Sequence, residues 1–218
     1  MSQPQAALVA VRSFDIGYCL GFRYWNLGLG VTRSIAIDID NTLWDFAPVF
    51  YERLKQINPD VPPPSGWTDW DFWKPYVKSS LLYDVIHEVH LRQEEYPPYP
   101  QARPFLVALK KEGYHIIIAS HRRRGARDAT LRWLLGNDLP FDELHLSFDK
   151  SVLFGDCWGL VDDSPVMLEK ARRAGLVRAG LLNPWNAGTG HPLFGSLEEV
   201  LEYLDGQWVG ERRGSTGE

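Results

Sequence analysis

The sequence predicts an α/β fold built on a parallel, doubly wound sheet. The first observation is a set of short apolar runs rich in β-branched residues, such as those at 34–39 and 115–120, which are typical of strands buried on both faces. The second is that these runs alternate with segments whose apolar residues recur at helical spacing. Strands that alternate with helices form parallel sheets with right-handed crossovers, so we expect that arrangement here.

The composition is that of an ordinary globular chain. Its 218 residues, 44% hydrophobic and 23% charged, suffice for one large core or for a core with a small insert. The net charge of −5 provides no overall attraction to nucleic acid or to an anionic membrane. Cys19 and Cys157 do not make a disulfide framework, and residues 1–30 fit neither a signal peptide nor a spanning helix. We therefore expect a cytoplasmic protein with no nucleic-acid or membrane partner.

The first hundred residues contain one strand and a long insertion. Residues 1–32 form an N-terminal extension that the sequence leaves unassigned, between a strand, a hairpin and an unfolded leader. After the strand at 34–39 come, in order, a helix at 46–57, a proline-rich break at 62–66, an aromatic-rich stretch at 66–76, a helix at 80–91 and a linker at 96–100. Because this block separates the first strand from the next α/β unit, we interpret residues 46–100 as a small helical cap inserted into the core.

The α/β alternation then resumes and continues to residue 205. Proline near a helix start and glycine after its end mark boundaries, as at Pro104 and Gly113. The expected elements are helices at 103–112, 126–135, 165–174 and 197–204 and strands at 115–120, 143–147, 158–163 and 177–182. The core therefore comprises residues 33–45 and 101–205, and residues 206–218 are a polar tail expected to be flexible.

Polar residues suited to chemistry follow several of the predicted strands. Asp38 and Asp40 follow the first strand, Ser120 the second, and Asp162 and Asp163 the fourth, with Lys150 shortly before it; these strand ends meet at one edge of a parallel sheet. Two neighbouring carboxylates repel each other unless a cation lies between them, which favours a hard divalent metal. Taken singly, each residue also suits a turn, a helix start or a solvated surface. Their joint occurrence favours a phosphate site.

These motifs resemble those of the haloacid-dehalogenase-type phosphatases. The sequence DIDNT at 38–42 is similar to the first motif of that superfamily, Ser120 to the second, Lys150 to the third and Asp162-Asp163 to the fourth, and the resemblance covers residues 34–205. The lysine ahead of GDCWGLVDDSP at 155–165 is similar to the type C 5′(3′)-deoxyribonucleotidases. Asn41 departs from the glycine more frequent there, and the Thr-Leu-Trp continuation at 42–44 resembles magnesium-dependent phosphatases with little cap.

The resemblance implies a Rossmann-like core and a reaction through Asp38. Mg²⁺ would be held by Asp38, Asp162 and the backbone carbonyl of Asp40. Asp38 would attack phosphorus to form an aspartyl-phosphate, and Asp40 would act as acid and then as base. Lys150 and Ser120 would stabilise charge on the transferring phosphoryl group. Asp163 would hold Lys150 or a metal-bound water.

The remaining candidates concern substrate contacts. His87 and His90 are three residues apart, which favours an exposed helix face over a zinc site. The basic run 121–124, which begins with His121, is as compatible with an anion-binding rim as with a solvated helix start. The aromatic residues at 67–73 suit base stacking or cap packing; Trp70 and Trp73, together with Asn41 and His121, are the proposed substrate contacts.

The sequence therefore favours a Mg²⁺-dependent phosphomonoesterase that acts on a small phosphorylated substrate such as a (deoxy)nucleoside monophosphate. The alternatives are a phosphatase of another small metabolite and a non-catalytic binding protein with the same fold. The complete set of acids argues against the binding protein, because such a protein has no use for Asp40.

Overall fold

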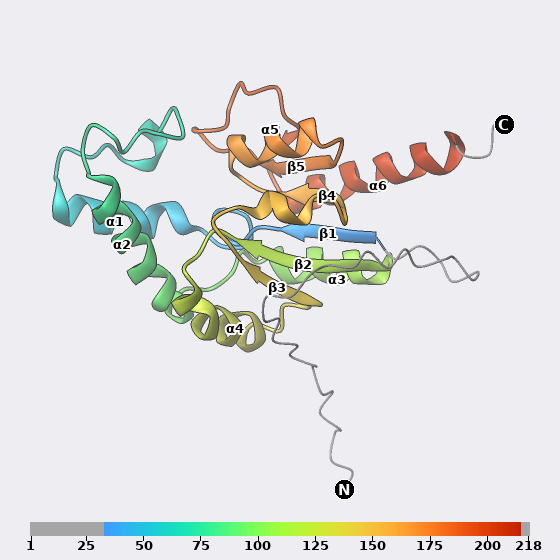
Figure 1. The fold of residues 1–218 in the computed structure, drawn as a ribbon, viewed down its shortest axis with the longest axis horizontal. Coiled ribbons are helices and arrows are strands. Elements are labelled where there is room, and N and C mark those ends of the chain that lie inside the picture. The colour runs from blue at the N-terminus through green and yellow to red at the C-terminus, as the bar shows by residue number, and fades with distance from the viewer. Residues whose placement is uncertain (1–32, 215–218) are drawn as a thin grey trace, which may run out of the picture. The chain divides into compact units, whose positions relative to one another are not determined.

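The computed structural model describes residues 33–214, so the N-terminal extension predicted at 1–32 lies outside the described residues. Six parallel strands form one sheet in the order β3-β2-β1-β4-β5-β6 (Figure 1). Their bounds are β1 Arg33–Ile37, β2 Tyr114–Ser120, β3 Glu143–Leu146, β4 Cys157–Val161, β5 Val177–Leu181 and β6 Leu193–Phe194. The predicted parallel, doubly wound sheet is confirmed.

The central strand β1 is apolar because both of its faces are covered. Ile35 and Ile37 are fully buried on one face, where the helices α3 (Ala102–Lys111), α4 (Arg127–Gly136) and α6 (Leu197–Gly214) contribute to the same hydrophobic cluster. Ala36 lies in the second cluster, to which α5 (Pro165–Arg173) contributes. Successive side chains of a strand point to opposite faces, so a short run of isoleucine and alanine supplies both layers.

The insertion between β1 and α3 contains α1 (Phe46–Ile57), the 3₁₀ turn η1 (Pro64–Gly66), α2 (Ser79–Leu91) and the turn η2 (Gln93–Glu95). Proline at its first position opens η1, and the buried positions Phe50 and Leu54 of α1 are four residues apart on one face. Buried insert residues such as Trp67 and Val85 belong to the same hydrophobic cluster as the sheet. The boundaries 46–100 for a separate cap stay a prediction.

Two elements differ from the sequence-based expectation. The two-residue strand β6 is not foreseen, because two residues carry no periodic signal. Helix α6 continues to residue 214, so residues 206–214 are helical where a flexible tail was expected. The guanidinium of Arg33 lies over the ring of Trp208, and this cation–π contact ties the extended part of the helix to the start of β1.

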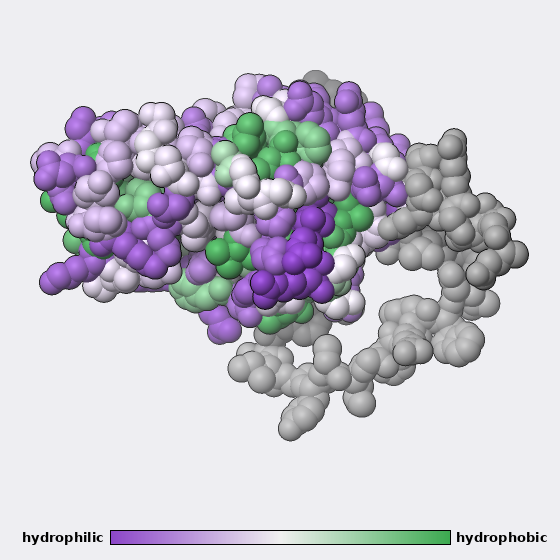
Figure 2. Space-filling model, turned by 90° about the horizontal axis from the view of Figure 1, so that it is seen from above, coloured by the Kyte–Doolittle hydropathy of each residue, from purple (hydrophilic) through white to green (hydrophobic). Residues whose placement is uncertain are grey.

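Within residues 33–214, no helix combines the length and the apolar character needed to cross a bilayer. On the face seen in Figure 2, apolar residues lie in small groups between hydrophilic ones.

Candidate active site

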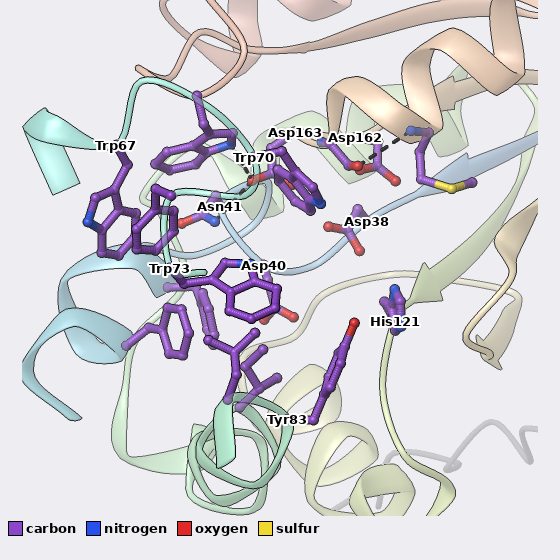
Figure 3. Close-up of a pocket in the computed structure, with 18 of the residues that line it drawn as sticks. Asp38, Asp40, Asn41, Trp67, Trp70, Trp73, Tyr83, His121, Asp162 and Asp163 are labelled. Atoms are coloured by element: carbon purple, nitrogen blue, oxygen red, sulfur yellow. Dashed lines mark hydrogen bonds between the residues drawn. The ribbon is translucent and has the colours of Figure 1, made fainter. Parts of the chain in front are cut away.

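A cavity of about 190 Å³ lies at the carboxyl ends of β1 and β4, where the strand order reverses. Open α/β sheets bind ligands at this point. One part of the cavity is polar and the remainder is lined by aromatic and aliphatic residues, most of them from the insert (Figure 3). The polar lining includes Asp38, Asp40, Asn41, Lys150, Asp162 and Asp163.

The turn after β1 directs two carboxylates to the cavity. Asp38 and Asp40 are separated by Ile39, which is fully buried. The amides of Thr42 and Leu43 both bond back to the carbonyl of Ile39 and close the turn. Asn41 has a left-handed backbone (φ 53°), which asparagine tolerates better than most residues. This backbone conformation explains how asparagine can occupy position 41, where the family that the motif resembles more often has glycine.

Asp38 and Asp162 are placed side by side by the backbone. The amide of Asp38 donates to the carbonyl of Val161 at 2.9 Å, and the amide of Asp162 donates to the carbonyl of Ala179 at 3.1 Å. Gly180 permits this approach, because a Cβ at that position would collide with the carbonyl oxygen of Asp162. The ladder of the sheet therefore continues one residue beyond β1 and β4 and aligns the two carboxylates.

Lys150 joins these two carboxylates. Its Nζ atom lies 2.7 Å from Asp38 Oδ1 and 2.7 Å from Asp162 Oδ2, and its side chain is 4% exposed. Burial opposes the ammonium charge, but the two carboxylates outweigh it and raise the pKa of Lys150. Of the two roles considered for Asp163, an ion pair with Lys150 is not formed in this structure; the lysine pairs with Asp38 and Asp162.

Three buried carboxylates form a group that suits a cation. Oxygen atoms of Asp38, Asp162 and Asp163 all lie within 4.8 Å of one another. Burial and the neighbouring carboxylates raise the pKa of Asp38 to about 7 although Lys150 opposes them, and they raise the pKa of Asp163 well above its ordinary value. Excess negative charge in a buried oxygen cluster is the environment that hard divalent cations such as Mg²⁺ occupy. The residues present therefore fit the expected metal.

Asp163 is held by Asn41, whose proposed contact with substrate stays a prediction, and by Trp185 and Asn186, which were not predicted from the sequence as site residues. Its Oδ2 atom accepts from Asn41 Nδ2 at 3.0 Å and from Trp185 Nε1 at 3.2 Å, and its carbonyl accepts from Asn186 Nδ2 at 2.9 Å. Trp185 and Asn186 lie in the loop after β5, the neighbour of β4. A signal was present, since a polar Asn-Pro-Trp-Asn segment follows a predicted strand whose end meets the same edge.

Asp40 is surrounded by donors rather than by acids. Its Oδ1 atom accepts from Trp44 Nε1 at 2.8 Å and from Arg122 Nη2 at 2.6 Å, and its Oδ2 atom lies 2.9 Å from His90 Nε2. Burial raises the pKa of Asp40, but the Arg122 guanidinium and the hydrogen bonds from His90 and Trp44 outweigh this, so its pKa is well below the usual range. The expected exposed helix face is wrong for His90, which is buried against Asp40. Burial and the nearby Arg122 lower the pKa of His90 to about 4, so this imidazole is neutral at pH 7.

Ser120, expected to contact phosphate, is not among the residues that line the cavity. Ser120 is fully buried at the end of β2, and its Oγ atom accepts from Arg122 Nε at 3.0 Å. The following residue, His121, does line the cavity, with its ring 6.3 Å from that of Tyr83 and 4.9 Å from that of Phe148. A contact between Ser120 and phosphate stays a prediction.

The aromatic residues of the insert that line the cavity differ in how far they are exposed. Trp67 is 2% exposed, stacks on Phe72 with ring centroids 4.0 Å apart, and donates from Nε1 to the carbonyl of Pro62. Trp70 is 41% exposed, and it and the half-buried Trp73 lie along the cavity near Asp38 and Asp40 (Figure 3). Trp70 and Trp73 line the same cavity as the carboxylates, and their contact with substrate stays a prediction.

Comparison with known proteins establishes the fold. No family model matches the chain. A curated protein from Chlorobaculum tepidum, named as a candidate 5′(3′)-deoxyribonucleotidase, is 26% identical over 162 residues, which cover 65% of this chain and 75% of that protein. A predicted phosphoglycolate phosphatase from Haemophilus somnus has a TM-score of 0.56 at 17% identity, over 79% of this chain and 98% of its own. A haloacid-dehalogenase-like family hydrolase from Xanthomonas campestris has a TM-score of 0.54 at 11% identity, over 80% and 91%. This chain has the fold of the haloacid-dehalogenase-like hydrolases, as its motifs predicted.

Proposed function

We propose that this chain is a Mg²⁺-dependent phosphomonoesterase that forms an aspartyl-phosphate on Asp38. The observation that carries the proposal is the arrangement at the end of β1. Asp38 lies with Lys150 and Asp162, while Asp40, two residues on, lies among hydrogen-bond donors in the same cavity. An attacking carboxylate and a separate proton-transferring carboxylate are what a two-step phosphoryl transfer requires.

The first step uses both carboxylates. A carboxylate oxygen of Asp38 attacks phosphorus, the bond from phosphorus to the leaving oxygen breaks, and Asp40 gives a proton to that oxygen. In the second step water attacks the aspartyl-phosphate, Asp40 takes a proton from the water, and phosphate leaves as Asp38 is regenerated. Lys150 offsets negative charge at Asp38 throughout. A bound Mg²⁺ would be held by Asp38, Asp162 and the backbone carbonyl of Asp40, and it supplies the positive charge that lets an anion approach an anionic ester.

The proposed substrate is a (deoxy)nucleoside monophosphate. Two observations support it: the likeness to a candidate 5′(3′)-deoxyribonucleotidase and the aromatic wall beside the carboxylates. Indole rings such as those of Trp70 and Trp73 provide flat surfaces on which a base can stack. A phosphatase of another small metabolite is the second candidate, favoured by the fold shared with a predicted phosphoglycolate phosphatase.

The test is a screen of phosphate release from a panel of nucleoside monophosphates, sugar phosphates and an aryl phosphate. We expect hydrolysis with Mg²⁺, loss of hydrolysis with excess EDTA, and recovery when Mg²⁺ is restored. Full activity in EDTA would exclude the metal role of Asp38 and Asp162. No release from any ester in the presence of Mg²⁺ would overturn the proposed function.

A further inference from the structure

A buried arginine lies directly behind the proposed acid. Arg122 is 2% exposed and follows the end of β2 by two residues, whereas its neighbour Arg123 pairs with Asp84 at the surface. Removing a guanidinium from water is costly unless its charge and its donors are satisfied. The contacts of Arg122 therefore show which groups satisfy its charge and its hydrogen-bond donors.

The guanidinium is held by three separate parts of the fold. Nε donates to Ser120 Oγ at 3.0 Å, Nη1 donates to Thr130 Oγ1 of α4 at 2.9 Å and also to Gln93 Oε1 of η2. Nη2 donates to Asp40 Oδ1 at 2.6 Å, and among the described residues Asp40 is the carboxylate with which Arg122 forms an ion pair. Contacts with β2, α4 and the insert hold the Arg122 guanidinium in one position. The guanidinium therefore also holds Asp40 Oδ1 in one position.

The other contacts of Asp40 leave one oxygen more available than the other. Oδ1 accepts two hydrogen bonds, from Trp44 and Arg122, whereas Oδ2 has the single partner His90 Nε2. A carboxylate oxygen can accept about two hydrogen bonds. Oδ1 is thus saturated, and Oδ2 retains the capacity to meet a leaving oxygen or a water.

We propose that Arg122 is a positioning residue that immobilises Oδ1 of Asp40 so that Oδ2 exchanges the proton with the leaving group. The inference rests on the proposed phosphomonoesterase function and adds the atom that transfers the proton and the residue that aims it. Gln93 of the insert belongs to the same hydrogen-bond network. The orientation of Asp40 is therefore coupled to the insert, other residues of which line the cavity.

The test compares leaving groups in Arg122→Lys. Lysine keeps the charge, but a single ammonium cannot contact Ser120, Thr130 and Asp40 with the planar geometry of the guanidinium. For a deoxynucleoside monophosphate, whose alkoxide must be protonated, we expect kcat/KM to fall about 100-fold, the lower end of what a positioned acid contributes. For 4-nitrophenyl phosphate, whose phenolate leaves unaided, we expect a loss of about threefold or less in the same measurement, because little of the acid contribution applies.

Two further variants separate positioning from folding. Arg132→Lys is the matched control, because Arg132 also joins α4 to η2, through Glu94, but at the surface and away from Asp40. It should leave the ratio of the two kcat/KM values unchanged. Thr130→Val removes one acceptor of Arg122 with little change of shape and should shift the ratio in the direction of Arg122→Lys by a smaller factor.

Equal losses on both substrates in Arg122→Lys and Thr130→Val would overturn the positioning role and assign Arg122 to stability alone. If Arg122→Lys does not fold, Thr130→Val decides the question by the same ratio. A wild-type protein that hydrolyses no ester of the panel would overturn the proposed function, and this inference with it. If the panel identifies another alkyl phosphate as the substrate, that ester takes the place of the nucleotide in the comparison. A wild-type protein that is active, with an unchanged ratio in the folded variants, overturns this inference only.

Discussion

At the scale of single residues, the two carboxylates that end β1 lie in opposite electrostatic surroundings. Asp38 lies beside Asp162 and Asp163. Burial, together with the charges of Asp162 and Asp40, raises the pKa of Asp38 to about 7 against the opposing effect of Lys150, while Asp40 pairs with Arg122 and has a lowered pKa. Environments that separate two pKa values are typical of carboxylates with different roles. A divalent cation at the acidic cluster would lower the pKa of Asp38, and the dianionic phosphate of a substrate would raise that of Asp40, so each ligand moves its carboxylate towards the form the first step needs.

The proposed division of roles, with Asp38 as nucleophile and Asp40 as acid, predicts different defects for two isosteric variants. Asp38→Asn removes the attacking oxygen and should abolish phosphoenzyme formation with every ester. Asp40→Asn keeps the nucleophile but lacks the acid, so kcat/KM for a nucleotide should fall by about 10²- to 10⁴-fold and that for an aryl phosphate far less. Its phosphoenzyme should accumulate, because the base of the second step is also missing. The measurement is a pre-steady-state burst with trapping of the acyl phosphate.

A trapped phosphoenzyme in Asp38→Asn would assign the nucleophile elsewhere. Normal turnover of the nucleotide by Asp40→Asn would remove the acid role. Unchanged melting temperatures in both variants would establish that the defects are chemical rather than structural.

Residues at strand ends are the part of the site that the sequence makes predictable. Asp38, Asp40 and Asp162 could be grouped because the carboxyl ends of parallel strands meet at one edge. Arg122 and His90 could not be assigned to the site, because neither a basic run after a strand nor a histidine on a helix indicates which way its side chain faces. Their burial depends on the packing of α2 and α4 against the core, which is a long-range property.

At the scale of elements, the insert supplies two kinds of aromatic residue. Trp67 is enclosed by Phe50, Phe72 and Trp185 and belongs to the hydrophobic cluster. Trp70 is partly exposed at the cavity. The same residue type thus has a packing role at one position and an open face at another, three residues away.

This contrast predicts that Trp67→Ala mainly lowers stability, whereas Trp70→Ala mainly weakens the binding of a nucleotide. Trp67→Ala empties a packed site and should lower the free energy of unfolding by about 3–5 kcal/mol. Trp70→Ala removes an exposed ring, so its stability should change by less than about 1 kcal/mol, while KM for a nucleotide rises about tenfold, as the loss of one stacking contact implies. Denaturant unfolding and steady-state kinetics on a nucleotide and an aryl phosphate measure both effects.

An equal rise of KM for both substrates in Trp70→Ala would contradict base stacking at this ring. Trp73→Ala, at a half-buried position of the cavity lining, is the parallel variant and should resemble Trp70→Ala rather than Trp67→Ala.

Elements with a clear period were predicted to within a residue or two of their ends. The helix expected at 46–57 is α1, and the strand expected at 115–120 is β2, which begins one residue earlier. Helix α6 was cut short in the prediction because Gly206 and a polar sequence are typical of a helix end. Arg33 and Trp208 are far apart in the sequence, so their contact gives no local signal from which the helix end could be predicted.

At the scale of the whole molecule, the order of the strands creates the site. The chain proceeds from β1 to β2 and β3 on one side and then crosses to β4 on the other side of β1 (Figure 1). This reversal brings the loops after β1 and β4 together, with Lys150 arriving from the crossing segment. The alternation of strands and helices predicted parallel strands, but it does not fix their order, so the adjacency of β1 and β4 rested on the resemblance of the motifs.

The global stability of the protein should depend on Mg²⁺ and on pH together. In the cation-free protein the pKa of Asp38 is about 7, above its ordinary value of 3.8, so the folded state holds this proton more tightly than the unfolded chain. The stability from this proton is complete below pH 4 and is lost as the pH rises through 7. The proposed Mg²⁺ would bind the deprotonated cluster and compete with the proton. We therefore expect Mg²⁺ to stabilise the protein more at pH 8 than at pH 5.5.

Thermal melts with and without Mg²⁺ at these two pH values measure this coupling. A free Mg²⁺ concentration of about 100 Kd contributes about 2.7 kcal/mol, which raises Tm by about 5–10 °C for a chain of this size. His90 acts in the opposite sense, since its pKa of about 4 in the folded state means that stability is lost as the pH falls below 6.5. That loss is present with and without Mg²⁺ and cancels in the difference between the two melts.

An Asp162→Asn variant, with one carboxylate of the cluster removed, should show a much smaller Mg²⁺ response at pH 8. A shift of equal size at both pH values, or an undiminished shift in this variant, would place the cation away from the cluster.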